Sequence, residues 1–155
     1  MNIIALITSI AVAQMAGVVG SVFTISGVGS WYMFLEKPLL TPPSWVFGPV
    51  WTTLYALMGI AAYLVWCKRN ALGAKTALLV YGVHLVLNAL WSILFFGVKD
   101  LGWAFAEILL LLGFILATTV LFWKIRPLAG MLLIPYIAWV SFAAYLNLAI
   151  WILNG

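Results

Sequence analysis

Five long apolar stretches dominate this sequence, and few folded structures can contain them. They run over residues 3–25, 46–66, 77–97, 101–124 and 128–152. Each is close to the ~20 residues that an α-helix needs to cross the hydrocarbon core of a bilayer. A helix also satisfies its own backbone hydrogen bonds, as any lipid-exposed span must. The pattern therefore predicts an all-α integral membrane protein, with one domain of five transmembrane helices over residues 1–155.

The scarcity of charge supports this interpretation. Only 6% of the 155 residues are charged and 67% are hydrophobic, whereas about 25% of an average soluble domain is charged. Such a chain cannot cover a surface exposed to water. The net charge of +4 does not indicate a nucleic-acid partner, because the Lys and Arg residues lie mostly in short breaks beside apolar stretches. A single cysteine, Cys67, excludes an internal disulfide framework, and no metal site is predicted.

The distribution of basic residues predicts an orientation in the membrane. The second break holds Lys68, Arg69 and Lys75, and the fourth holds Lys124 and Arg126. The first and third breaks hold one basic residue each, next to an acid. Because Lys and Arg accumulate in cytoplasmic loops, the second and fourth breaks are expected inside. The N-terminus is then also inside, while the long first loop, residues 26–45, and the C-terminus are outside.

Local features of the first and fifth stretches carry further expectations. Ala11-Val12-Ala13 resembles a signal-peptide cleavage site, but no Lys or Arg precedes it, so the segment is expected to remain as a span. Gly17 and Gly20 form a surface of small residues, suited to close helix packing or to dimerisation. Pro135 is expected to kink the fifth helix.

Nine tryptophans fall into two groups. Six lie near predicted helix ends, where an aromatic belt at the headgroup level explains them. They are Trp31, Trp45, Trp66, Trp103, Trp123 and Trp151. The remaining three, Trp51, Trp91 and Trp139, lie inside spans.

The three internal tryptophans share helix faces with polar or small residues. Trp51 is followed four residues later by Tyr55; the other two stripes hold Asn88, Trp91, Ser92 and Phe95, and Trp139, Ala143 and Asn147. At 1.5 Å per residue all of them fall in the outer half of the bilayer, beneath the long loop. A polar amide in lipid must face the bundle interior, so the three faces are expected to converge. Interhelical hydrogen bonding with aromatic packing explains this, and so does an aromatic pocket for a flat hydrophobic ligand.

Two ionisable residues inside the spans have more than one interpretation. His84 is the only histidine, and it suits a hydrogen-bonded interior residue or an axial ligand of a metalloporphyrin. Glu107 suits a buried helix contact or a functional carboxylate. The sequence has no paired carboxylates, no nucleophile with a base and no glycine-rich phosphate loop, so nothing in it indicates hydrolysis or phosphoryl transfer.

Three segments resemble one known family. Residues 31–55 read WYMFLEKPLLTPPSWVFGPVWTTLY, residues 87–96 read LNALWSILFF, and residues 135–147 read PYIAWVSFAAYLN. These motifs and their order resemble those of the tryptophan-rich sensory proteins, whose mitochondrial members are the translocator proteins, or peripheral benzodiazepine receptors. The resemblance covers nearly the whole chain and favours a bacterial-type member, in a bacterial or archaeal cell membrane.

The resemblance implies five transmembrane helices, commonly a homodimer, and a receptor or sensor that binds porphyrins such as protoporphyrin IX. It also implies isoquinoline carboxamide and benzodiazepine-type ligands, with the porphyrin as ligand and no required cofactor. The implied ligand-binding residues are Tyr32, Trp51, Tyr55, Asn88, Trp91, Ser92, Trp139, Ala143 and Leu146. An alternative is an enzyme that degrades porphyrin oxidatively in light, with Trp51 and Trp139 as its catalytic residues; another is a tetrapyrrole transporter.

One departure concerns cholesterol. Mammalian members have a Tyr and then a Lys or Arg after the Leu-Asn pair near the C-terminus. Here Leu146-Asn147 is followed by LAIWILNG, which contains neither. Cholesterol binding through that motif is therefore not expected.

Overall fold

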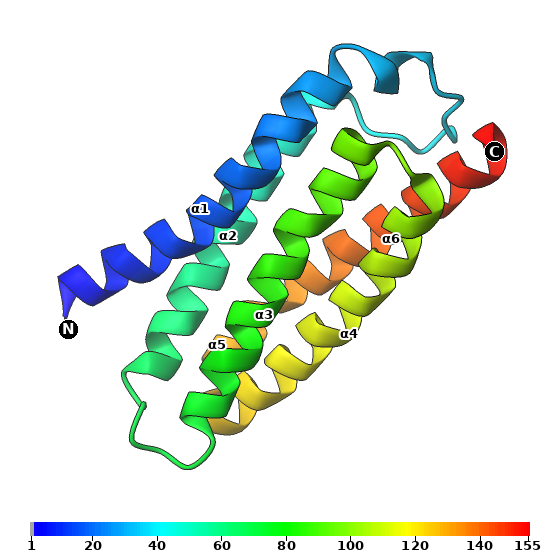
Figure 1. Ribbon diagram of the computed structural model, residues 1–155. Coiled ribbons are helices and arrows are strands. Elements are labelled where there is room, and N and C mark those ends of the chain that lie inside the picture. The colour runs from blue at the N-terminus through cyan, green and yellow to red at the C-terminus, as the bar shows by residue number, and fades with distance from the viewer. Residues whose placement is uncertain (1) are drawn as a thin grey trace.

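The computed structural model describes residues 2–155, which fold into a helical bundle (Figure 1). In chain order the elements are α1 (Ile3–Val28), the short 3-10 helix η1 (Trp31–Phe34), α2 (Ser44–Trp66), α3 (Ala74–Ser92), the π-helical turn η2 (Ile93–Val98) that continues α3, α4 (Leu101–Ile125), α5 (Pro127–Met131) and α6 (Ile134–Asn154). No strand occurs within these residues.

Five helical segments of the described chain are long and apolar enough to cross a membrane, which confirms the predicted all-α class. They are Ile3–Val28, Ser44–Trp66, Ala74–Val98, Leu101–Ile125 and Pro127–Asn154. Each extends one to three residues beyond the predicted stretch at one or both ends, whereas α1 and α4 begin at the predicted residues, Ile3 and Leu101, directly after a capping side chain. The Asn2 side chain accepts from Ala5 N at the start of α1, and Asp100 accepts from Trp103 N at the start of α4.

The fifth span is two helices rather than one. α5 ends at Met131, and α6 begins at Ile134 with Pro135 in its first turn. Proline has no backbone N–H and cannot donate to the carbonyl one turn earlier. The kink expected at Pro135 is therefore a complete break.

Small residues let α1 lie close to its neighbours. A Cβ added at Gly59 would lie 2.5 Å from the Ile10 Cα, and one added at Gly20 would lie 2.9 Å from the Ser92 Oγ. Gly17 faces the Tyr55 ring in the same way. The small-residue surface of α1 thus serves close helix packing within the chain.

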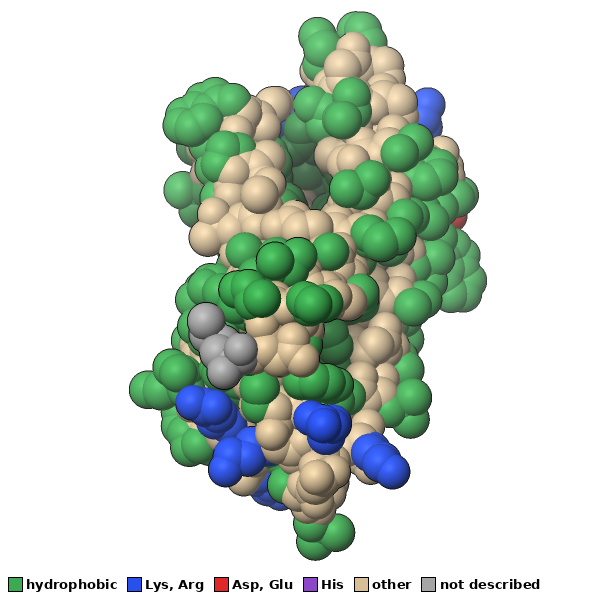
Figure 2. Space-filling model, turned by 90° about the vertical axis from the view of Figure 1, so that its left-hand side faces the viewer, with side chains coloured by type: hydrophobic (Ala, Val, Ile, Leu, Met, Phe, Trp, Pro, Cys, Tyr) green, Lys and Arg blue, Asp and Glu red, His purple; other side chains and the backbone are tan. Residues whose placement is uncertain are grey.

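The two ends of the bundle differ in charge and are named here accordingly. The basic end carries Lys68, Arg69, Lys75, Lys124 and Arg126, close to the α2–α3 connection and the α4–α5 junction. Figure 2 shows Lys and Arg side chains gathered there, at the bottom of the view. The loop end carries residues 29–43 with η1, together with the C-terminal end of α6 (Figure 1).

Candidate ligand-binding cavity

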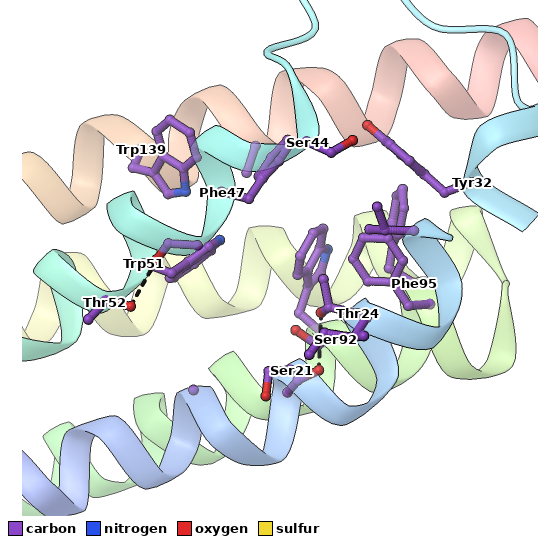
Figure 3. Close-up of a pocket in the computed structure, with 18 of the residues that line it drawn as sticks. Ser21, Thr24, Tyr32, Ser44, Phe47, Trp51, Thr52, Ser92, Phe95 and Trp139 are labelled. Atoms are coloured by element: carbon purple, nitrogen blue, oxygen red, sulfur yellow. Dashed lines mark hydrogen bonds between the residues drawn. The ribbon is translucent and has the colours of Figure 1, made fainter. Parts of the chain in front are cut away.

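A cavity of about 650 Å³ lies inside the bundle near the loop end. Its walls come from α1, α2, α6 and the junction of α3 with η2, and η1 contributes Tyr32 from above. Figure 3 shows these side chains projecting toward a shared space, and Figure 2 shows the hollow in the upper half of one face. No Asp, Glu, Lys, Arg or His belongs to the lining within residues 2–155.

Aromatic rings from α2, α3, η2 and α6 line the cavity and support one another. The Trp51 ring is stacked on Tyr55, with centroids 5.5 Å apart and planes at 27°. Phe47 meets Trp139 edge-on at 6.0 Å, and Trp91 lies 5.1 Å from Phe95. Such pairs contribute ~0.5–1.5 kcal/mol beyond area burial, so the rings hold one another in place without a ligand.

A hydrogen-bonded group holds Tyr55 at the cavity wall. The Tyr55 hydroxyl donates to Asn88 Oδ1, and Asn88 Nδ2 donates to the Tyr136 hydroxyl at 2.8 Å. Asn88 is 3% exposed and is not among the lining residues. Its amide therefore connects α2, α3 and α6 behind the wall, and Tyr55 rather than Asn88 lines the cavity.

A second amide joins the helices beside the cavity. Trp91 Nε1 donates to Asn147 Oδ1 at 3.1 Å, and Asn147 Nδ2 donates to the Leu101 carbonyl at 2.9 Å. This fixes the Trp91 ring against the cavity and ties α3 to α6 and α4. The Nε1 of Trp139 is also buried, but it has no hydrogen-bond acceptor among the described residues.

The side of the cavity formed by α1 is polar and was not anticipated as a ligand surface. Gln14, Ser21 and Thr24 line it at helical spacing with Gly17. Gln14 Nε2 donates to the Thr52 carbonyl of α2 at 3.0 Å, whereas Thr24 bonds back to its own helix at Gly20 O. The spacing of these residues in the sequence could have revealed this face, but the small residues of α1 were expected to serve close helix packing or dimerisation.

Eight of the nine residues expected at a ligand site lie together at the cavity wall, and Asn88 does not. The eight are Tyr32, Trp51, Tyr55, Trp91, Ser92, Trp139, Ala143 and Leu146. Their convergence under the loop matches the arrangement expected from helical spacing and depth, while their contact with a ligand stays a prediction. Unanticipated lining residues include Phe47, Phe96 and Ile150.

His84 and Glu107 lie behind the wall. His84 has no exposed surface, and its Nδ1 is 3.2 Å from the Thr118 Oγ1. Because Thr118 donates its own hydrogen to Phe114 O, it accepts from His84, which is thus the hydrogen-bonded interior residue. Glu107 is 7% exposed, and neither carboxyl oxygen has a hydrogen-bond partner in the described chain.

Comparison with known proteins agrees with this architecture. The TspO/MBR family matches residues 9–152 of the chain. The human translocator protein is 45% identical over 136 residues, which is 86% of this chain and 80% of the human protein. A tryptophan-rich protein TspO from Archaeoglobus fulgidus is 40% identical over 155 residues and the full length of both chains. Protein CrtK of Rhodobacter capsulatus is 39% identical over 90% of this chain and 86% of its own length.

The family match spans nearly the entire chain, and the Archaeoglobus fulgidus relative matches it over the full length of both chains. Five apolar helices of spanning length complete the agreement. This chain is therefore an integral membrane protein that belongs to the TspO/MBR family.

Proposed function

We propose that this protein is a membrane receptor or sensor that binds a porphyrin-type tetrapyrrole in the cavity under the loop. The observation that supports this most directly is the cavity itself, which holds about 650 Å³ and is lined by aromatic rings with no charged side chain among the described residues. Ligand pockets are commonly ~300–1,000 Å³ and mostly apolar, with a few polar groups. A flat macrocycle gains stacking area from Trp51 and Trp139 and meets hydroxyls on the opposite side.

The same cavity would accept isoquinoline carboxamide or benzodiazepine-type ligands, because these are also flat, aromatic and mostly uncharged. Binding of either kind needs no cofactor. We further propose that the protein forms a homodimer in a bacterial or archaeal cell membrane, with the loop end outside. The proposal includes no cholesterol site.

A second function is favoured by one observation, the presence of Trp51 and Trp139 in the wall of one cavity. An indole beside an illuminated porphyrin can be oxidised, so the alternative is an enzyme that consumes porphyrin and molecular oxygen in light. The receptor and the enzyme share the binding step and differ in the fate of the bound porphyrin.

A titration of the purified protein with protoporphyrin IX, in the dark and under illumination with oxygen, tests both functions. A receptor binds saturably in the dark and leaves the porphyrin absorbance unchanged in light beyond a protein-free control. Protein-dependent bleaching that Trp51→Phe abolishes, with dark binding retained, favours the enzyme. Absence of saturable binding in the dark contradicts the proposed function.

A further inference from the structure

The upper limit of the cavity contains two hydroxyl groups that are available to a ligand. Tyr32 of η1 and Ser44, the first residue of α2, both line the cavity. Figure 3 shows their hydroxyl ends pointing toward one another at the loop end of the space. No hydrogen bond joins either hydroxyl to another group within residues 2–155. Tyr32 as a whole is only 7% exposed, but its hydroxyl is not one of the fully buried polar atoms that lack a partner, so the cavity reaches it.

A cation lies beside the Tyr32 ring, outside the cavity lining. The Lys37 ammonium lies 4.6 Å from the centroid of the Tyr32 ring and donates to the Leu35 carbonyl at 3.1 Å. An ammonium group has three N–H donors, so others remain available. Lysine also has a flexible four-carbon side chain, which lets the charge shift toward a ligand at the Tyr32 hydroxyl.

The protonation state of Tyr32 suits donation to an anion. Burial raises the pKa of the Tyr32 phenol above its ordinary value of 10.0. The hydroxyl therefore keeps its proton throughout the physiological range, and it cannot become an anion that repels a carboxylate. The adjacent α2 N-terminus adds the positive end of a helix dipole, although this alone defines no site.

The loop that carries Tyr32 and Lys37 is held in position at its far side. Glu36 N donates to Asn154 Oδ1 at 2.9 Å, and Asn154 Nδ2 donates to the Glu36 carbonyl at 2.9 Å. This reciprocal pair joins the loop to the last turn of α6. Tyr32 also packs on Phe95 and Phe96, with centroids 6.2 and 5.8 Å away. Tyr32 is therefore positioned before a ligand arrives, which lowers the entropic cost of binding, whereas Lys37 must still reorient.

We propose that Tyr32, Ser44 and Lys37 form a carboxylate subsite at the loop end of the cavity, which selects aromatic ligands with an acidic side chain. In this arrangement the flat ring system occupies the aromatic cavity and its carboxylate meets the two hydroxyls and the ammonium. The porphyrin part of this inference rests on the proposed function, because protoporphyrin IX carries two propionates. The subsite itself applies to any aromatic carboxylate of suitable size.

Two matched pairs of probes test the subsite, namely protoporphyrin IX with its dimethyl ester, and pyrenebutyrate with its methyl ester. Within each pair the ester lacks the negative charge, is a weaker acceptor and carries one added methyl group on each carboxyl. The comparison between variants, in which the methyl groups stay constant, therefore isolates the charge. We expect the acid to bind ~10-fold more tightly than the ester, since a hydrogen bond to a charged group is worth about one such factor. Lys37→Gln and Tyr32→Phe should each reduce that ratio, and added salt should weaken only the acid.

Lys99→Gln is the matched control, because it removes a cation from the loop end without touching the cavity lining. It should leave both ratios unchanged. The proposal is overturned if wild-type protein binds acid and ester equally, or if Lys37→Gln weakens both by the same factor. Failure of both porphyrins to bind, with the pyrene pair still discriminated, refutes the porphyrin function and leaves the subsite standing. Failure of all four probes refutes the subsite as well.

Discussion

The basic end and the loop end of the bundle differ in which side chains lie between the helices. At the basic end small side chains, among them Ala61 and Ala62 of α2, Ala77 of α3, and Ala129 of α5, are buried between larger ones such as Phe122 and Leu133. At the loop end the facing positions are Trp51, Trp91, Trp139, Phe47 and Phe95, around the cavity.

The difference shows how side-chain size along a helix sets its separation from a neighbour. Interaxial distances vary over ~8–10 Å with the residues at the contact. Alanine and glycine allow backbones to approach, as at Gly59 and Ile10. Large planar rings hold helices apart and, once stacked on one another, cannot fold inward to fill the gap. We attribute the cavity to the rings of α2, α3 and α6, since the α1 side of its wall carries Gly17 and Gly20.

The largest expected effect concerns orientation, because each end of the bundle lies on one side of the membrane or on the other. The Lys and Arg excess predicts that the basic end is inside, since these residues resist translocation. In a Cys67→Ser background, Thr41→Cys should react with a membrane-impermeant maleimide in intact cells. Lys75→Cys should react only after permeabilisation. The opposite labelling pattern contradicts the predicted orientation.

Close packing outside the cavity should be intolerant of a single methyl group. Gly59→Ala places a Cβ 2.5 Å from the Ile10 Cα, a backbone atom that cannot rotate away. We expect a loss of ~1–3 kcal/mol in the free energy of unfolding, the usual cost of overpacking. Thermal unfolding in detergent measures it. Gly113→Ala, where nothing lies within 4 Å of the added Cβ, is the control and should be neutral or slightly stabilising.

Asn88 lies behind the aromatic wall, and its replacement tests how that wall is supported. Asn88→Leu leaves the Tyr55 and Tyr136 hydroxyls without their present partner. We expect a loss of ~1–3 kcal/mol in unfolding free energy, the cost of a buried unsatisfied group. Adding Tyr55→Phe and Tyr136→Phe should recover part of it. A variant of unchanged stability but lower porphyrin affinity would instead place Asn88 in contact with the ligand, as the resemblance implies.

Tryptophan substitutions at the two ends should give the smallest but most specific difference. Porphyrin binding is expected to quench tryptophan emission, and Trp51→Phe and Trp139→Phe should each weaken that quenching by a few-fold at most, because phenylalanine retains much of the stacking area. Trp66→Phe and Trp123→Phe, near the basic end, should change it little. If the protein degrades porphyrin in light, Trp51→Phe and Trp139→Phe should reduce the rate of degradation by a larger factor than they reduce porphyrin affinity. Equal behaviour of all four variants would remove the special status of the cavity tryptophans.

Much of the cavity wall could be predicted from helical spacing. Trp51 with Tyr55, and Trp139 with Ala143, lie one turn apart on single helices, so the sequence places each pair on one face whatever the tertiary arrangement. The need to bury amides in lipid then predicted convergence, and Trp91 and Asn147 do meet. The α1 face was missed because small residues suit packing and ligand contact equally, and spacing does not distinguish them.

The sequence alone determined the five spans and the charge difference between the ends, because both follow from local properties. Helix length is limited by bilayer thickness, and the positions of Lys and Arg are read directly. Only the tertiary structure decided that Asn88 faces two tyrosines rather than the cavity. It also decided that Tyr32 and Ser44 line the same cavity, with Lys37 beside the Tyr32 ring. These outcomes depend on how far apart separate helices and the loop lie, which is set by packing between segments distant in the chain.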